Sequence, residues 1–217
     1  MTITKEATAL TPVPAKTDDL SWDDFTTALK AASEAEEVRL AEVIPIPAVT
    51  GKPGSDEWNS QFDANYRAKS QQRDALSRFQ SKLVLAVGAA VAGEVEDFSS
   101  IDINYEGSGD SGEACDIYVS VSRKLNTDGN GKHVPFTDEE TAAYRAKCDA
   151  ANSLLSSDLR EWLDETCWGI AYAAHPGFET DAGGFGTITI AREDGELQLT
   201  LEHTERTEVS YATEVLA

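Results

Sequence analysis

The sequence predicts an α+β protein, in which an antiparallel sheet of two β-hairpins packs on two or more helices and follows an N-terminal helical extension. Alternating apolar and polar residues indicate two strand–turn–strand segments, at about 101–123 and 185–204. Apolar residues at helical spacing lie between the hairpins and before them. The chain has 217 residues, 41% of them hydrophobic, which is enough for one sizeable core. We expect three regions: a disordered tail over 1–17, a helix and proline-rich linker over 18–54, and the α+β domain over 55–217.

The N-terminal region begins with a segment of small polar residues and prolines, which is typical of disorder. Ser21 is placed to cap a helix, with Asp24 at its third position, and the helix is expected from Trp22 to about Val43. The following segment, IPIPAVTGKPG, cannot continue a helix because its prolines lack the backbone donor, so it should be extended.

A long second helix is expected from Ser55 to about Val91, with a break near Gly88 or Gly93 because glycine is a weak helix former. Aromatic and aliphatic residues recur along one side of it at helical spacing, from Trp58 to Val87. Such a stripe is typical of a core face, and the alternative is a homodimer contact through the aromatic helix 56–91.

The first hairpin is expected to begin at Ile101 and to turn through a glycine-rich loop over 107–112. Ile101, Ile103 and Tyr105 fall on one face of its first strand, and the second strand should run from about Ala114 to Arg123. This strand and loop organise the C-terminal half of the chain.

Two helices should connect the hairpins. Thr137 and Glu140 have the spacing of a capping box, so the first helix is expected from Asp138 to about Leu155. Ser157 would cap the second, from Asp158 to about Ala174, and Pro176 with Gly177 would end it.

The second hairpin has the strongest turn signal in the chain, Asp194–Gly195. A two-residue turn there fixes the register, so that Ile190 pairs with Leu199 and Gly186 with His203. We expect the apolar face to pack on the helices, with His203 a satisfied, half-buried imidazole on that face, and the Thr, Gln and Glu face to look to solvent. His175 is expected to cap the last carbonyls of the preceding helix. The tail from Glu205 offers a fifth, edge strand through Val209 and Tyr211.

The net charge is −21, from 39 acidic and 18 basic residues. The imbalance is greatest over 101–217, which carry 23 acids and 8 bases. Such a surface repels nucleic acid and anionic membrane and attracts a basic protein, a cation or a protein site that normally holds nucleic acid. We therefore expect a protein partner with a basic surface, no direct nucleic-acid binding and no membrane association. The alternative is that the charge serves solubility alone.

The cysteines are Cys115, Cys148 and Cys167, an odd number without a C-x-x-C pair. This argues against a disulfide framework and a zinc knuckle. The N-terminus lacks the apolar segment of a signal peptide, so a reducing cytoplasm is the expected location.

Three stretches carry a resemblance to a known family: YEGSGDSG at 105–112, HPGFETDAGGFG at 175–186 and LEHTER at 201–206. Their order and spacing resemble an uncharacterised family, a domain of unknown function from bacteria and their phages, over roughly residues 98–215. The resemblance implies a compact α+β domain and a bacterial or phage source, and it carries no activity over. The family usually has Trp at the position of Phe178 and Asn at those of Asp181 and Thr204, which puts contacts that need an amide in doubt.

Two functional hypotheses follow. The first is a non-enzymatic acidic binding protein, acting as a nucleic-acid mimic or an inhibitor of a host defence system. Its carboxylates would stand in for phosphates on a basic or nucleic-acid-handling protein. The helical residues nominated for this role are Asp138, Glu139, Glu140, Asp158, Glu161, Asp164 and Glu165.

The second hypothesis is a divalent-metal-dependent hydrolase centred on the two glycine-rich loops. Carboxylates suit Mg²⁺, Mn²⁺ or Ca²⁺, and a bound metal could activate water. The nominated metal ligands are Glu106, Asp110, Glu179 and Asp181, with Ser111 and Glu202 as further binding residues. Glu202 and His203 point to opposite faces of one strand, so both cannot join one site without a bulge. No cofactor is expected other than such a cation.

Overall fold

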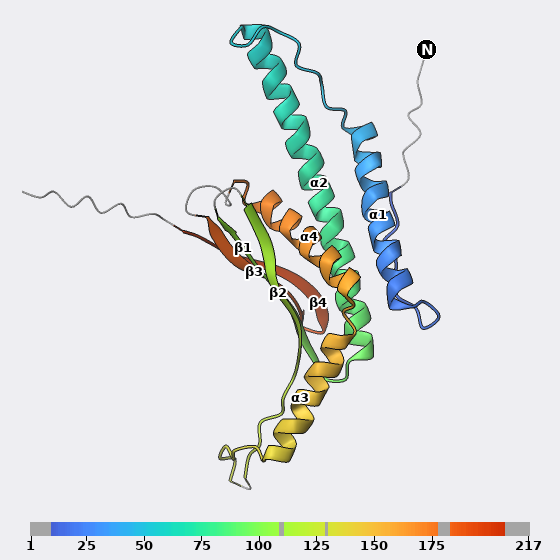
Figure 1. The fold of residues 1–217 in the computed structure, drawn as a ribbon, viewed down its shortest axis with the longest axis vertical. Coiled ribbons are helices and arrows are strands. Elements are labelled where there is room, and N and C mark those ends of the chain that lie inside the picture. The colour runs from blue at the N-terminus through green and yellow to red at the C-terminus, as the bar shows by residue number, and fades with distance from the viewer. Residues whose placement is uncertain (1–9, 109–110, 129, 178–182, 207–217) are drawn as a thin grey trace, which may run out of the picture.

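The fold is α+β, as the sequence predicts. A computed structural model describes residues 10–108, 111–128, 130–177 and 183–206, with the backbone alone at 108 and 111–115 (Figure 1). The helices of this part are α1 (Trp22–Val43), α2 (Asp56–Glu94), α3 (Asp138–Ser153) and α4 (Ser157–Ala174). The strands are β1 (Phe98–Ser108), β2 (Ser111–Val121), β3 (Gly184–Glu193) and β4 (Glu196–Glu205).

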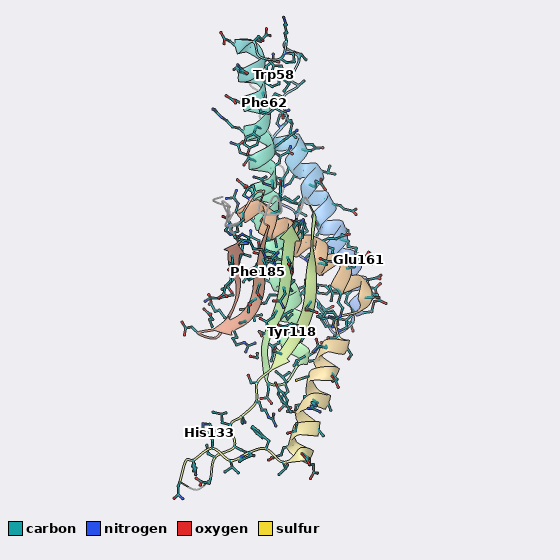
Figure 2. All side chains as sticks on the ribbon, turned by 60° about the vertical axis from the view of Figure 1, so that its left-hand side comes forward. Trp58, Phe62, Tyr118, His133, Glu161 and Phe185 are labelled. Atoms are coloured by element: carbon teal, nitrogen blue, oxygen red, sulfur yellow. The ribbon has the colours of Figure 1, made fainter. Side chains whose placement is uncertain are left out.

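The four strands form one antiparallel sheet in the order β2-β1-β3-β4. Helices α2 and α4 cover one face of the sheet, and α1 packs on the outside of both helices (Figure 1). The other face is open, and Figure 2 shows Tyr118 and Phe185 on its side of the strands. Both of these side chains are 43% exposed. The sheet therefore has one face buried by helices and one face exposed to solvent. This agrees with the alternation of apolar and polar residues along its strands.

The core lies between the sheet and the helices. Ile101, Ile103, Ile188 and Ile190 are fully buried there, together with apolar residues of α2 and α4. Fully burying such a side chain contributes about 1.5–3 kcal/mol. Phe25 of α1 is also fully buried in this cluster, so the N-terminal helix shares the core of the sheet.

The second hairpin has the predicted register. Ile190 pairs with Leu199, and Gly186 pairs with His203. Asp194 and Gly195 have φ values of 51° and 89°, as a two-residue turn with the twist of a hairpin requires. The predicted fifth strand falls in residues 207–217, outside the described residues.

The first hairpin is longer than the sequence predicts. Gly107 pairs with Gly112 inside the ladder, and β2 begins at Ser111 and ends at Val121. The expectation that 107–112 form a loop was therefore wrong. Glycine weakens a strand, but neighbouring strands on both sides of β1 satisfy the backbone at Gly107.

The helix caps follow the sequence with small shifts. Ser21 and Ser55 accept from the backbone N–H groups of Asp24 and Trp58, and Thr137 with Glu140 forms the predicted capping box. Helix α3 ends at Ser153 instead of Leu155. The cap of α4 is Ser156, which accepts from the N–H of Leu159, so the prediction of Ser157 was wrong by one residue.

Helix α2 has no break at its glycines, contrary to the prediction. A Cβ on Gly88 would lie 2.5 Å from Cγ2 of the buried Ile190. Gly88 therefore lets α2 pack directly against Ile190 of β3, and the packing gained there offsets the poor helix propensity of glycine. Gly93 has nothing within 4 Å of its missing Cβ.

The aromatic stripe of α2 divides into two parts. Phe79, Leu83 and Val87 are buried in the hydrophobic core, which confirms the core interpretation for that half. Phe62 and Tyr66 are 47% and 60% exposed, on the end of α2 that projects beyond the sheet (Figures 1 and 2). Only this projecting half stays available for the predicted homodimer. By length and composition α2 could cross a membrane, but its most apolar half is the core helix of this fold.

Side chains from α3 and α4 close the outer edge of β2. The amide of Asn152 accepts from the N–H of Val119 and donates to the carbonyl of the same residue, both at 2.9 Å. Arg160 donates to the carbonyl of Ile117. These contacts occupy backbone groups that an unprotected edge would offer to another strand.

The two glycines of α2 provide a matched stability test. We expect Gly88→Ala to lower the free energy of unfolding by about 1 kcal/mol, because overpacking against Ile190 outweighs the gain in helix propensity. Gly93→Ala should raise it by up to about 1 kcal/mol, since nothing opposes that gain. Urea denaturation measures both, and a Gly88→Ala variant at least as stable as Gly93→Ala would contradict the close approach of α2 to β3.

Candidate functional site

The helical carboxylates nominated from the sequence lie at the surface. Asp138 and Glu139 are exposed in the first turn of α3. Glu140 is exposed but engaged, because it accepts from Asn126 and from the backbone of Thr137. Those hydrogen bonds hold the pKa of Glu140 below its usual value. The nominated carboxylates of α4 are Asp158, Glu161 and Glu165, which are exposed, and Asp164, which is partly buried.

The nominated metal ligands are not seen as a group. Glu106 lies on the open face and forms an ion pair with Arg206. The Arg206 guanidinium lies 5.4 Å from the centre of the Phe185 ring, so it connects three strands. Asp110, Glu179 and Asp181 fall outside the described residues, as does the side chain of Ser111. Glu202 is exposed on the open face, opposite in direction to His203, as predicted.

The covered face, at the same end of the sheet, holds a cluster that joins the stretches 105–112, 175–186 and 201–206. The Tyr105 hydroxyl of β1 lies 2.9 Å from Nδ1 of His203 on β4. The ring of His175, at the end of α4, stacks on the ring of His203 with centroids 4.0 Å apart. Residues from 105–112, 175–186 and 201–206 thus meet at one point, although nearly 100 residues separate the first from the last.

Two glycines of β3 make room for this cluster. A Cβ on Gly186 would lie 2.1 Å from the Glu202 carbonyl and 2.4 Å from the Tyr105 hydroxyl. A Cβ on Gly184 would lie 2.9 Å from Cε1 of His203. The Tyr105 side chain therefore crosses β3 at Gly186 to reach β4, which no other residue type at 186 would allow.

Burial favours the neutral forms of Tyr105 and His203. Burial raises the pKa of Tyr105 to about 12, so its hydroxyl remains protonated. Burial, followed by the neighbouring His175, lowers the pKa of His203 below the usual 6.5, while Glu205 acts in the opposite direction. A neutral His203 ring can accept at one nitrogen and donate at the other.

Glu205 completes the cluster, since it follows His203 by two residues and lies on the same side of β4. The donor atoms of His175, His203 and Glu205 all lie within 4.8 Å of one another, and these residues could hold a metal ion. Sequence reasoning missed this group. The prediction of a half-buried, hydrogen-bonded His203 agrees with its Tyr105 contact. The prediction that His175 caps α4 is confirmed, because its backbone N–H donates to the carbonyl of Ala171. The predicted register placed His203 near this end of β4, and the predicted helix end placed His175 just after α4. How α4 packs on the sheet, which brings the two imidazoles together, could not be predicted from either signal.

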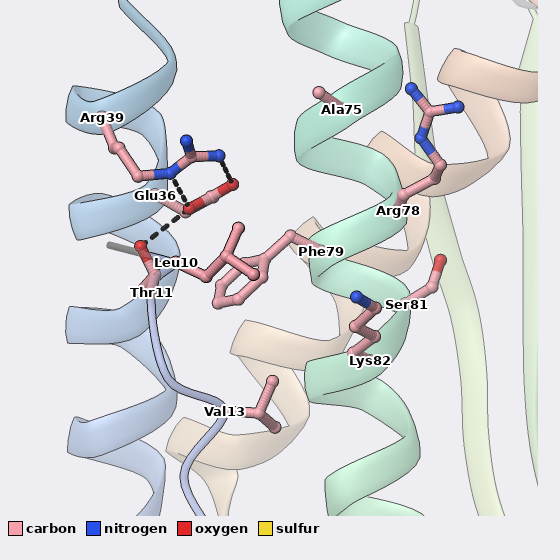
Figure 3. A pocket seen from close by; sticks show the side chains of 10 residues that line it. All are labelled: Leu10, Thr11, Val13, Glu36, Arg39, Ala75, Arg78, Phe79, Ser81 and Lys82. Carbon is pink, nitrogen blue, oxygen red and sulfur yellow. Dashed lines mark hydrogen bonds and ion pairs between the residues drawn. The ribbon is translucent and has the colours of Figure 1, made fainter. Parts of the chain in front are cut away.

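A second, separate hollow of about 480 Å³ lies between α1, α2 and the segment before α1 (Figure 3). At its wall Glu36 is buried and paired with Arg39 at 2.6 Å, and it accepts from the Thr11 hydroxyl at 2.7 Å. The hydrogen bond from Arg39 lowers the pKa of Glu36. A buried, paired carboxylate of this kind anchors the N-terminal segment to α1, so we interpret this hollow as structural.

The His203 environment predicts a pH dependence of stability in metal-free protein. The folded chain lowers the pKa of His203, and His175, Glu205 and Tyr105 are the titratable groups that face it. The unfolded chain then binds the proton more readily, so stability falls as pH drops from about 6.5 through the lower folded-state pKa. Urea denaturation in EDTA should show this slope reduced in His203→Gln. An imidazole signal of His203 that titrates above 6.5 would contradict it.

Comparison with known proteins shows that the cluster lies inside the part of the chain that matches a family model. A family of unknown function, DUF6878, matches residues 89–215, which include all four strands, α3 and α4. The hollow around Glu36 lies outside the matched residues. No match was found among curated proteins or among solved structures. The chain belongs to the DUF6878 family of unknown function.

Proposed function

We propose that this protein is a non-enzymatic binding protein, which attaches through an acidic helical face to the basic surface of a protein that handles nucleic acid. The acidic face consists of Asp158, Glu161 and Glu165 of α4 with Glu34 of α1. In this role its carboxylates stand in for phosphates, and the protein acts as an inhibitor by occupying a groove meant for nucleic acid.

One observation carries the proposal: the single basic residue of α4 points inward. Arg160 donates to the backbone carbonyls of Leu155 at 3.0 Å and Asn152 at 2.9 Å, besides that of Ile117. Its charge is therefore committed to holding α4 against α3 and β2. Asp158, Glu161 and Glu165 form no ion pair with another described residue. The outer side of α4 thus carries uncompensated negative charge.

Helix α1 extends this charge. Glu34 and Glu165 line one shallow hollow between α1 and α4, with Lys30 as its one cation. Arg39, the other basic residue of α1, is paired with the buried Glu36. Arg160 and Arg39 are thus engaged inside the fold, whereas Glu34, Asp158, Glu161 and Glu165 are exposed. Glu161 lies at the outer edge of the molecule in Figure 2.

The spacing of the charges is of the right order for a phosphate mimic. Residues 158, 161 and 165 follow each other along the helix axis at about 4.5 and 6 Å. Phosphates of one DNA strand follow each other at about 3.4 Å along the duplex axis. A groove lined by Lys and Arg could therefore engage several of these carboxylates at once.

The test compares two sets of three neutralised acids. The first is Asp158→Asn/Glu161→Gln/Glu165→Gln, and the matched control is Glu193→Gln/Asp194→Asn/Glu196→Gln at the exposed β3–β4 turn. We expect the α4 set to weaken binding of an oligolysine peptide about tenfold at low salt, because each exposed charge pair contributes about 0.2–1 kcal/mol. Isothermal titration calorimetry at low and physiological salt measures this.

The control set should change the affinity by less than about twofold, since it removes the same charge from another surface. Equal losses from both sets would show that net charge alone attracts the peptide, and the acidic face would then have no special role.

A further inference from the structure

We propose that His175, His203 and Glu205 bind one divalent transition-metal ion, of the Zn²⁺ class, at the end of the sheet. This site is independent of the acidic face, and its ligands differ from the carboxylates nominated from the sequence. Three protein ligands would leave a fourth coordination position for water or a ligand.

The fold brings these ligands together from two elements. His203 and Glu205 alternate on β4 and so lie on the same face of that strand. His175 follows the last residue of α4, and its ring reaches back to stack on His203. Glu205 is exposed and both histidines are partly buried, so the site opens to solvent on the carboxylate side.

The donor atoms are somewhat farther apart than in a formed metal site, so the ligands must move closer together when the ion binds. Zn²⁺ binds imidazole nitrogen at about 2.0–2.1 Å, which places tetrahedral ligand atoms about 3.4 Å apart. The donor atoms lie within 4.8 Å of one another, so shifts of about 1 Å bring them into contact. The two imidazoles are stacked in nearly parallel planes, so the His175 ring must also turn to direct a nitrogen lone pair at the ion. The side chains of His175 and Glu205 can supply these movements by rotation, because neither is fully buried.

His203 is already oriented by its surroundings. Its Nδ1 lies 2.9 Å from the Tyr105 hydroxyl, and that hydroxyl lies 3.4 Å from the Glu202 carbonyl. An ion on Nε2 would fix the proton on Nδ1, which then donates to Tyr105, and Tyr105 donates to the carbonyl. Metal-binding imidazoles use such an outer partner to fix tautomer and ring direction. Gly184 leaves the side of the ring that carries Nε2 without a Cβ against it.

The ligand types favour one class of ion. Two imidazoles and one carboxylate suit Zn²⁺, Co²⁺ or Ni²⁺, whereas Mg²⁺ and Ca²⁺ prefer sites made of oxygen. We therefore expect Mg²⁺ at millimolar concentration not to displace Zn²⁺.

The full chain is titrated with Zn²⁺ by calorimetry and with Co²⁺ by visible absorption. We expect one ion per chain and Co²⁺ bands of low coordination number. Loss of a residue that only hydrogen-bonds a metal ligand lowers metal affinity about 10–100-fold. Glu205→Gln and His175→Gln each remove a ligand itself, so each should weaken binding by at least that much. Tyr105→Phe should weaken it about tenfold, as loss of an orienting partner.

Matched controls lie on the same molecule. Glu202→Gln changes the same residue type on the opposite side of β4, and His133→Gln removes an exposed histidine far from the cluster. Both should bind Zn²⁺ as the wild type does. The chain has three histidines, so Zn²⁺ should shift the imidazole signals of His175 and His203 and leave that of His133 unchanged. Zn²⁺ binding that survives Glu205→Gln and His175→Gln, or no binding by the wild type, would overturn the proposal.

Discussion

The architecture of the family-matched region depends on one close approach, the crossing of the Tyr105 side chain over Gly186 to His203. A methyl group at 186 would collide with both the Tyr105 hydroxyl and the Glu202 carbonyl. The contact therefore needs glycine in the middle of a strand, where glycine is otherwise unfavourable. It ties β1 to β4 across β3, and it brings His203 beneath the ring of His175 at the end of α4.

The distribution of charge follows from a second feature of the fold, the engagement of three arginines in contacts within the molecule. Arg160 closes the edge of β2, Arg39 holds the buried Glu36, and Arg206 pairs with Glu106 across the open face. Arg160 and Arg206 each join separate elements, and Arg39 pairs with the carboxylate that holds the segment before α1. The excess of acid that the sequence carries is consequently presented to solvent, and the surface of α4 is more acidic than composition alone suggests.

Local rules predicted most of the fold. A two-residue turn at Asp194–Gly195 permits one register, so the partners in the second hairpin followed from the sequence. A side-chain cap such as Ser21 acts within one turn of the helix, so the start of α1 could also be predicted from the sequence. Tertiary packing decided the rest: Gly88 stays helical because β3 lies against it, and Gly107 stays in a strand because it has neighbours on both sides. The meeting of the two imidazoles depends on how α4 is placed on the sheet, which no local pattern contains.

The central claim is that three distant stretches of the sequence converge on one cluster. Nuclear Overhauser contacts between the aromatic protons of Tyr105, His203 and His175 in metal-free protein test it most directly. The ring centroids lie 6.0 Å apart for Tyr105 and His203 and 4.0 Å apart for the two histidines. We predict cross-peaks for both pairs in the folded chain and their loss in Gly186→Ala. A well-folded wild-type protein that lacks the contact between Tyr105 and His203 would contradict the account.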